Sequence, residues 1–147
     1  MPPPTKLALC LSGGGFRAAL FHLGLLRRLH ELGTLGQVST ISSVSGGSIL
    51  AGLLCEQMRR YDLASLAEVG DWEAQIAVPL RRVVSRDLRT LPILATCLFN
   101  WVLPGPRAQA MLRRYRDRVS RLALVDIPAT PRFVFCASDL VFGANWT

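Results

Sequence analysis

Two stretches of the chain decide its fold: KLALCLSGGGFRA at residues 6–18 and QVSTISSVSGGS at residues 37–48. Each begins with a short run that contains apolar or β-branched residues and ends in a glycine-rich turn. Short runs of this kind, bounded by turn residues, are typical of buried parallel strands. We therefore expect strands at 6–11 and 37–44, each followed by a tight turn.

Helical patterns follow both turns. Between residues 16 and 32, apolar residues recur at helical spacing up to Gly33, which suits a helix end, and residues 48–61 predict a second helix. The order strand, turn, helix, strand, turn, helix predicts a right-handed βαβ unit with a further helix. We therefore expect an α/β fold with a mainly parallel sheet.

The rest of the chain is expected to extend the same single domain, residues 1–147. Residues 63–84 look helical, but Gly70 and Pro79 predict at least one break. Residues 91–103 are apolar, 107–122 form an arginine-rich amphipathic pattern, and 132–137 predict a third strand.

The composition favours a globular protein in a reducing compartment. Half of the residues are hydrophobic and 18% are charged, which argues against disorder. Cys10, Cys55, Cys97 and Cys136 form no CxxC motif and no cluster with histidine, so we expect buried free thiols and no metal site. The N-terminus has no signal-peptide pattern. We expect a cytoplasmic protein.

The first glycine turn predicts an anion site. A helix that starts at Gly13–Gly15 presents unpaired backbone N–H groups and the positive end of its dipole. Gly13, Gly15 and Ala18 fit a dinucleotide-binding motif, but the second strand lacks the acid which that motif needs. A P-loop is excluded because no Gly-Lys-Ser/Thr follows. An oxyanion hole and a purely structural turn stay open.

The second turn resembles a nucleophile elbow. In the G-x-S-x-G pattern a sharp strand-to-helix turn exposes the central serine. Here Ser45 takes the nucleophile position, Gly47 is the closing glycine, and Ser43 replaces the opening glycine. Adjacent parallel strands would bring both turns to one edge of the sheet.

The set SGGGFRA at 12–18, SVSGGS at 43–48 and FVFCASDL at 133–140 resembles the patatin-like phospholipase family. The resemblance implies a three-layer α/β/α fold and hydrolysis of lipid acyl esters by a Ser–Asp dyad, without a cofactor. It implies that Ser45 is the nucleophile and that Gly13, Gly14 and Gly15 form the oxyanion hole. Arg17, Ala18, Ser43, Gly46 and Gly47 would support the site, although Ala18 stands where many members have glycine.

An ordinary α/β-hydrolase is a weaker interpretation, because its triad needs a histidine. The chain has only His22 and His30, both upstream of Ser45. We interpret His22 as a packed helix residue and His30 as a surface residue.

The catalytic base is missing from the motif positions. The family uses an aspartate in a later Asp-Gly-Gly/Ala motif, and this chain contains no Asp-Gly pair. We assign the role to neither Asp126 nor Asp139. The chain is therefore expected to be the N-terminal portion of the domain, ending before that motif and incomplete at its C-terminal end. The alternative is an inactive truncated relative that binds lipid or a partner.

The expected partner is a lipid or phospholipid substrate, not a nucleic acid. The net charge of +7 comes almost wholly from arginine, which favours lipid phosphates but also suits solvated helix faces. A peripheral membrane contact through 91–103 and the arginine-rich helix at 107–121 is a second expectation. Residues 91–103 are too few to span a bilayer.

Overall fold

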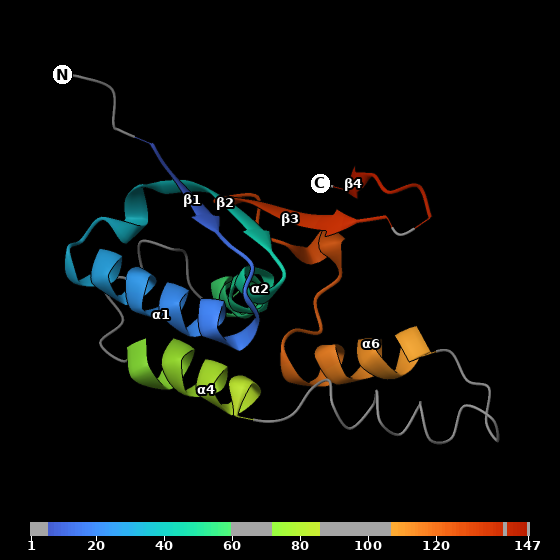
Figure 1. Ribbon diagram of the computed structural model, residues 1–147. Coiled ribbons are helices and arrows are strands. Elements are labelled where there is room, and N and C mark those ends of the chain that lie inside the picture. Colours follow the sequence, from blue (N-terminus) through green and yellow to red (C-terminus); the bar gives the residue numbers. More distant parts are fainter. Residues whose placement is uncertain (1–5, 60–71, 86–106, 140, 147) are drawn as a thin grey trace.

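The computed structural model describes residues 6–59, 72–85, 107–139 and 141–146 (Figure 1). The predicted order of strand, helix, strand and helix at the start of the chain is confirmed. The helices and strands are, in chain order, β1 (Leu7–Leu11), α1 (Gly15–Glu31), η1 (Leu35–Gln37), β2 (Val38–Val44), α2 (Gly46–Met58), η2 (Glu73–Ala77), α4 (Val78–Val84), α6 (Arg107–Arg118), η3 (Leu124–Asp126), β3 (Arg132–Ser138) and β4 (Asn145–Trp146).

Three parallel strands form the centre of the sheet. Their order is β1-β2-β3, and the short strand β4 pairs antiparallel with the end of β3. Strand β2 is paired along both edges, so that Ile41 lies opposite Leu9 on β1 and Phe133 on β3. The α/β class and the mainly parallel sheet are thereby confirmed. Because the three strands run in the same direction, the turns that follow β1 and β2 reach the same edge.

Helices α1 and α2 pack together on one face of this sheet (Figure 1). The crossovers from β1 to β2 and from β2 to β3 advance in the same direction, and right-handed connections then place their helices on the same face. The core forms between this helical layer and the sheet, where Leu26, Ile41, Leu50 and Leu54 are fully buried. Burial of one such side chain contributes about 1.5–3 kcal/mol.

The opposite face of the sheet carries small side chains. Ala8 and Cys10 are exposed there, while Ser42 and Cys136 are half-buried. The prediction that the thiols are buried is therefore wrong for Cys10, because the described helices cover only the other face (Figure 1). Cys55 of α2 does fit it: burial raises the pKa of its thiol to about 12. The described residues thus supply the sheet and one helical layer of the three-layer arrangement.

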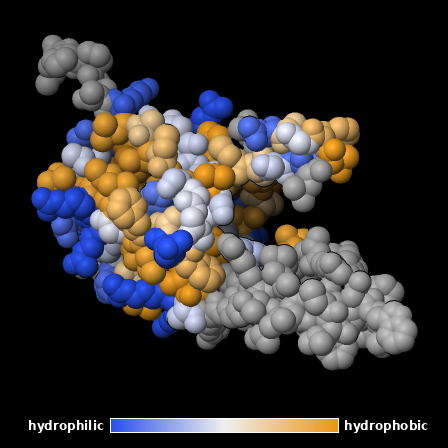
Figure 2. Space-filling model, in the orientation of Figure 1, coloured by the Kyte–Doolittle hydropathy of each residue, from blue (hydrophilic) through white to orange (hydrophobic). Residues whose placement is uncertain are grey.

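The surface is mixed in character. Figure 2 shows hydrophobic residues at the surface between hydrophilic ones. On α1, the side chains of Leu20, Phe21 and Leu25 are all exposed. Within the described ranges, no helix is both long and apolar enough to cross a bilayer.

The later helices can be compared with the predictions for Pro79 and for the arginine-rich segment. Residues 72–84 are helical throughout, and the break predicted at Pro79 is replaced by a change from the π-helical turn η2 to α4 at Val78. Gly70 lies outside the described residues. The amphipathic character of α6 is confirmed, since Tyr115 and the following Val119 pack against the core while Arg113 and Arg116 are exposed. The apolar stretch 91–103 lies outside the described residues.

Truncation of Leu50 tests this description of the core. Leu50 is fully buried in α2, so Leu50→Ala should lower the free energy of unfolding by about 2–5 kcal/mol through lost apolar contact and a cavity. Leu20→Ala on α1 is the control, since Leu20 is 43% exposed and surface changes usually stay within about 0.5 kcal/mol. Both values come from urea unfolding. Equal losses for the two variants would contradict the assigned core.

Candidate active site

Ser45 joins β2 directly to α2 and has an unusual backbone conformation. Its dihedrals are φ 52° and ψ −114°, and within the described ranges no other residue except glycine has a positive φ. Such conformations cost about 1–3 kcal/mol and persist only where the surrounding structure imposes them. Ser45 is exposed, whereas Ser43 and Gly46 on either side of the elbow are buried. The sharp turn therefore lifts the Ser45 side chain out of a packed sheet edge, beside Val44, which is 42% exposed.

The glycines after Ser45 are required by close backbone packing. A Cβ atom added to Gly46 would collide with the carbonyl oxygen of Gly15, and one added to Gly47 would collide with that of Leu11. The elbow therefore rests directly on the backbone of the first glycine turn. Any side chain at 46 or 47 would push the two turns apart.

The first glycine turn lies beside Ser45. A Cβ atom added to Gly13 would lie 3.5 Å from the Cβ atom of Ser45. Gly14 has φ 140° and Gly15 has φ 64°, values that residues with side chains rarely adopt. The structure thus brings Ser45 and the turn Gly13–Gly15 together, as the sequence predicted, and their catalytic roles stay predictions.

The supporting positions fall into two groups. Ala18 lies under the first turn, where a Cβ atom added to Gly14 would be 3.1 Å from the Ala18 Cβ, so a small residue fits there. Arg17 is exposed and, among the described residues, takes part in no salt bridge. The structure gives no reason why residue 17 should be arginine.

Ser43 uses its hydroxyl to hold the elbow. It is 2% exposed, and its Oγ donates to the Val134 carbonyl of β3 over 3.4 Å. Ser48 of α2 donates to the Ser43 Oγ over 3.2 Å. A glycine at 43 could make neither bond, so the serine that departs from G-x-S-x-G ties the elbow to a neighbouring strand and to α2.

Ser45 faces a pocket of about 580 Å³. Its walls come from the end of β2, the end of β3 and the start of β4: Val44, Ser45, Cys136, Ala137, Ser138 and Asn145. All of these side chains are uncharged. The pocket therefore presents no charged side chain to a substrate.

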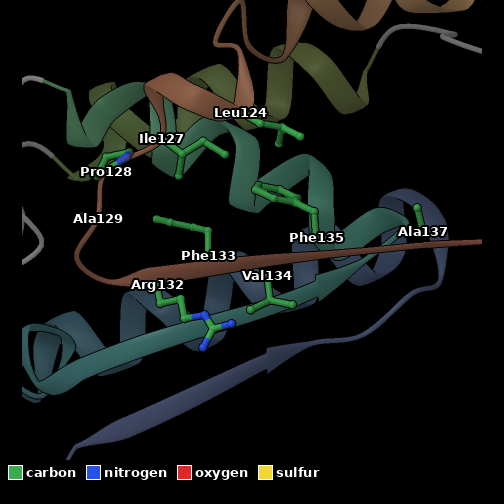
Figure 3. Close-up of a pocket in the computed structure, with 9 residues that line it drawn as sticks. All are labelled: Leu124, Ile127, Pro128, Ala129, Arg132, Phe133, Val134, Phe135 and Ala137. Atoms are coloured by element: carbon green, nitrogen blue, oxygen red, sulfur yellow. The ribbon is translucent and has the colours of Figure 1, made fainter. Parts of the chain in front are cut away.

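A second pocket, of about 650 Å³, runs along β3, and Ala137 lines both pockets. Figure 3 shows Phe133 and Phe135 on one side of the β3 ribbon, facing Leu124 and Ile127, with Val134 on the other side. Ser45 is not among its lining residues.

Two aspartates near this region serve local turns. Asp139 accepts backbone N–H bonds from Val141 and Phe142 at its Oδ1 atom, over 2.8 Å and 3.1 Å. Asp126 accepts the N–H of Ala123 over 3.2 Å. Neither contact involves Ser45. Within the described ranges, no cluster of His, Cys, Asp and Glu could hold a metal ion.

The burial and contacts of the two histidines differ in part from the prediction. His22 is buried, as expected, but its Nε2 atom lies 3.2 Å from the Oγ and 3.3 Å from the carbonyl oxygen of Ser12. His30 was expected at the surface but is half-buried, because its ring contacts Trp72. The His22–Ser12 contact was missed because residues ten apart give no sequence pattern.

The site defines a class of protein: an α/β fold in which a strained strand–serine–helix turn lies against a glycine turn at the carboxyl edge of a parallel sheet. The chain belongs to the patatin-like phospholipase family, whose sequence model matches residues 9–127. Neither the curated proteins nor the solved structures give a significant match. Membership of this family indicates a hydrolase that acts on acyl groups of lipids.

A matched pair of glycine substitutions tests the packing of the two turns. Gly47→Ala should be severely destabilising, because its methyl group would overlap the Leu11 backbone. Gly24→Ala should instead stabilise the protein by about 0.5–1 kcal/mol, since Gly24 is in α1 with open space around it. Thermal unfolding measures both. A tolerated Gly47→Ala would show that the turns do not touch.

The strain at Ser45 has its own test. Ser45→Gly removes the Cβ atom that disfavours φ 52°, so it should be more stable than Ser45→Ala by about 1 kcal/mol. Ala51→Gly in the interior of α2 is the control and should lose more than about 1 kcal/mol, because the helix cost of glycine adds to the loss of a buried methyl group. Urea unfolding of the three variants decides the question. The strain would be refuted by a glycine variant no more stable than the alanine variant.

Proposed function

We propose that the chain carries the nucleophile and oxyanion hole of a serine lipid acyl hydrolase of the phospholipase A type. Ser45 supplies the nucleophile, and the backbone N–H groups of Gly13–Gly15 supply the hole. The observation that carries the proposal is the strained, exposed Ser45 held in direct contact with a turn of three glycines. Backbone strain of this kind concentrates at functional sites.

The proposed reaction has two steps. The Ser45 Oγ attacks the carbonyl carbon of a lipid ester, its proton passes to a base, and the carbonyl oxygen becomes an oxyanion. Collapse of this intermediate expels the alcohol, which takes up the proton. Water then attacks the acyl–Ser45 ester, releasing the fatty acid and restoring the serine hydroxyl. Oxyanion donors about 2.7–3.1 Å away stabilise both intermediates.

The electrostatic surroundings favour negative charge at this edge. Both α1 and α2 begin here, and neither has an acidic residue in its first turn to oppose the positive end of the helix dipole. Ser45 is the N-cap residue of α2, yet its side chain makes no capping hydrogen bond. The hydroxyl therefore remains available to a substrate.

The base is not assigned to an aspartate of the described residues. The carboxylates of Asp126 and Asp139 accept backbone N–H bonds in their own turns. We propose, as the family resemblance implies, that an aspartate outside residues 1–147 completes the dyad.

The substrate is proposed to be a long-chain lipid ester. The uncharged walls of the Ser45 pocket suit the ester and the first part of an acyl chain. Contact with a membrane surface through α6 is an additional proposal, supported by its exposed Arg113 and Arg116.

Ester hydrolysis tests the proposal, with a purified protein that extends beyond residue 147 and includes the proposed aspartate. Long-chain p-nitrophenyl esters and phosphatidylcholine vesicles serve as substrates, with acyl release as the readout. Ser45→Ala should reduce turnover to background, because loss of the nucleophile can cost about a millionfold. Ser39→Ala is the control: Ser39 lies at the other end of β2, where it donates to the Leu7 carbonyl, and its loss should leave turnover unchanged.

Two outcomes would contradict the proposal. Hydrolysis that survives Ser45→Ala would place the nucleophile elsewhere. Vesicle binding without turnover, equal in the parent chain and in Ser45→Ala, would favour the alternative of a lipid-binding domain. Adding a chelator should change nothing, and loss of activity on chelation would point to a metal-dependent reaction.

A further inference from the structure

His22 is an unusual residue for the inner side of α1. It is 3% exposed. Within the described ranges, the one other buried polar side chain is that of Ser43. Buried polar groups are costly unless hydrogen-bonded. The Nε2 atom of His22 meets this need with Ser12, at 3.2 Å from its Oγ and 3.3 Å from its carbonyl oxygen, whereas the Nδ1 atom has no hydrogen-bond partner among the described residues.

The direction of the contact follows from helix geometry. Side chains on a helix tilt towards its N-terminus, so His22 reaches back to the turn from which α1 begins. With its proton on Nε2, His22 donates to the Ser12 carbonyl, which can only accept; in the other tautomer, Nε2 accepts from the Ser12 hydroxyl. In both tautomers, His22 holds the residue that precedes Gly13.

The glycine turn needs such a restraint. Gly14 and Gly15 both have positive φ, and glycine backbones have more conformational freedom than any other residue. An oxyanion hole works only if its donors are held in place before the charge develops. Among the described residues 12–15, the hydrogen bonds made by side chains are those between Ser12 and His22.

We infer that His22 is a positioning residue: through Ser12 it holds the Gly13–Gly15 turn in the conformation that the oxyanion hole requires. The inference rests on the proposed function for its catalytic meaning. The base role is not assigned to His22, because its Nε2 atom contacts Ser12 and not Ser45. Helix α1 then has two roles: it covers the sheet, and it fixes the glycine turn from which it starts.

A pair of amide substitutions separates positioning from packing. In His22→Gln, the side-chain nitrogen takes the place of Nε2 and can still donate to Ser12. In His22→Asn, the side chain is too short to reach Ser12. The readout is the rate at which a long-chain alkyl fluorophosphonate modifies Ser45. In that reaction the Ser45 Oγ bonds to phosphorus, fluoride leaves, and the serine proton goes to solvent.

His22→Asn should lower the maximal rate of modification about 10- to 100-fold, somewhat less than the direct loss of one oxyanion donor. The probe concentration at half-maximal rate should change little, because the hole acts on the transition state. His22→Gln should recover most of the rate. If both variants react at the parent rate, or if both lose it equally, His22 is a packing residue and the inference is wrong.

An NMR measurement tests the role of His22 independently of the proposed function. The amide resonances of Gly13, Gly14 and Gly15 should shift, and their hydrogen exchange should quicken, in His22→Asn but not in His22→Gln. The amide of Gly143, in the turn after β3, is the internal control. If a protein that extends beyond residue 147 and includes the proposed aspartate does not react with the probe, the proposed function fails, while the exchange data still decide the role of His22. Should His22→Asn not fold, His22→Phe can replace it. Phenylalanine keeps an aromatic ring and cannot form the hydrogen bond to Ser12.

Discussion

The fold of this chain depends on one contact: the backbone of the serine elbow packed against the backbone of the first glycine turn. Gly46 meets Gly15 and Gly47 meets Leu11 at distances that leave no room for a Cβ atom. This contact fixes where α2 begins, and with it the direction in which α2 crosses the sheet to bury Leu50 and its neighbours. The strain at Ser45 follows, because the chain must reverse within one residue to satisfy both the strand and the helix. Site and core are thus two results of the same close approach.

The same contact brings two helix starts together. The N-termini of α1 and α2 both lie at the carboxyl edge of the sheet, and each has a first turn without an acidic residue. Each helix end carries roughly half a positive charge. The nearby pocket is bounded by small uncharged side chains from β2, β3 and β4, so no charged wall offsets this field. Geometry and electrostatics therefore agree on where a negative charge would be stabilised, and the family membership of the chain agrees with both.

The sequence predicted this half of the molecule well because its information is local. Glycines between an apolar run and a helical pattern mark both turns, and strands β1 and β2 and helices α1 and α2 were found within a few residues of their ends. Three features depend on distant parts of the chain and were not predicted. Cys10 was expected to be buried, but which face of a strand is covered depends on the crossover directions. The bond from His22 to Ser12 joins residues ten apart, and the hydroxyl of Ser43 finds its acceptor on β3, far along the chain.

The order of the strands also has a consequence for how the protein is made. β1, α1, β2 and α2 are consecutive in the chain, so the turns at Gly13–Gly15 and Ser45 can dock before the later elements exist. The second edge of β2 must then wait for β3, which begins only at Arg132. At a synthesis rate of about 5–20 residues per second, one edge of β2 stays unpaired in the nascent chain for several seconds. During that interval the ribosome-bound intermediate offers its backbone N–H and C=O groups to any extended neighbour. The early docking of the two turns therefore precedes a period in which one edge of β2 is open to pairing with a wrong partner.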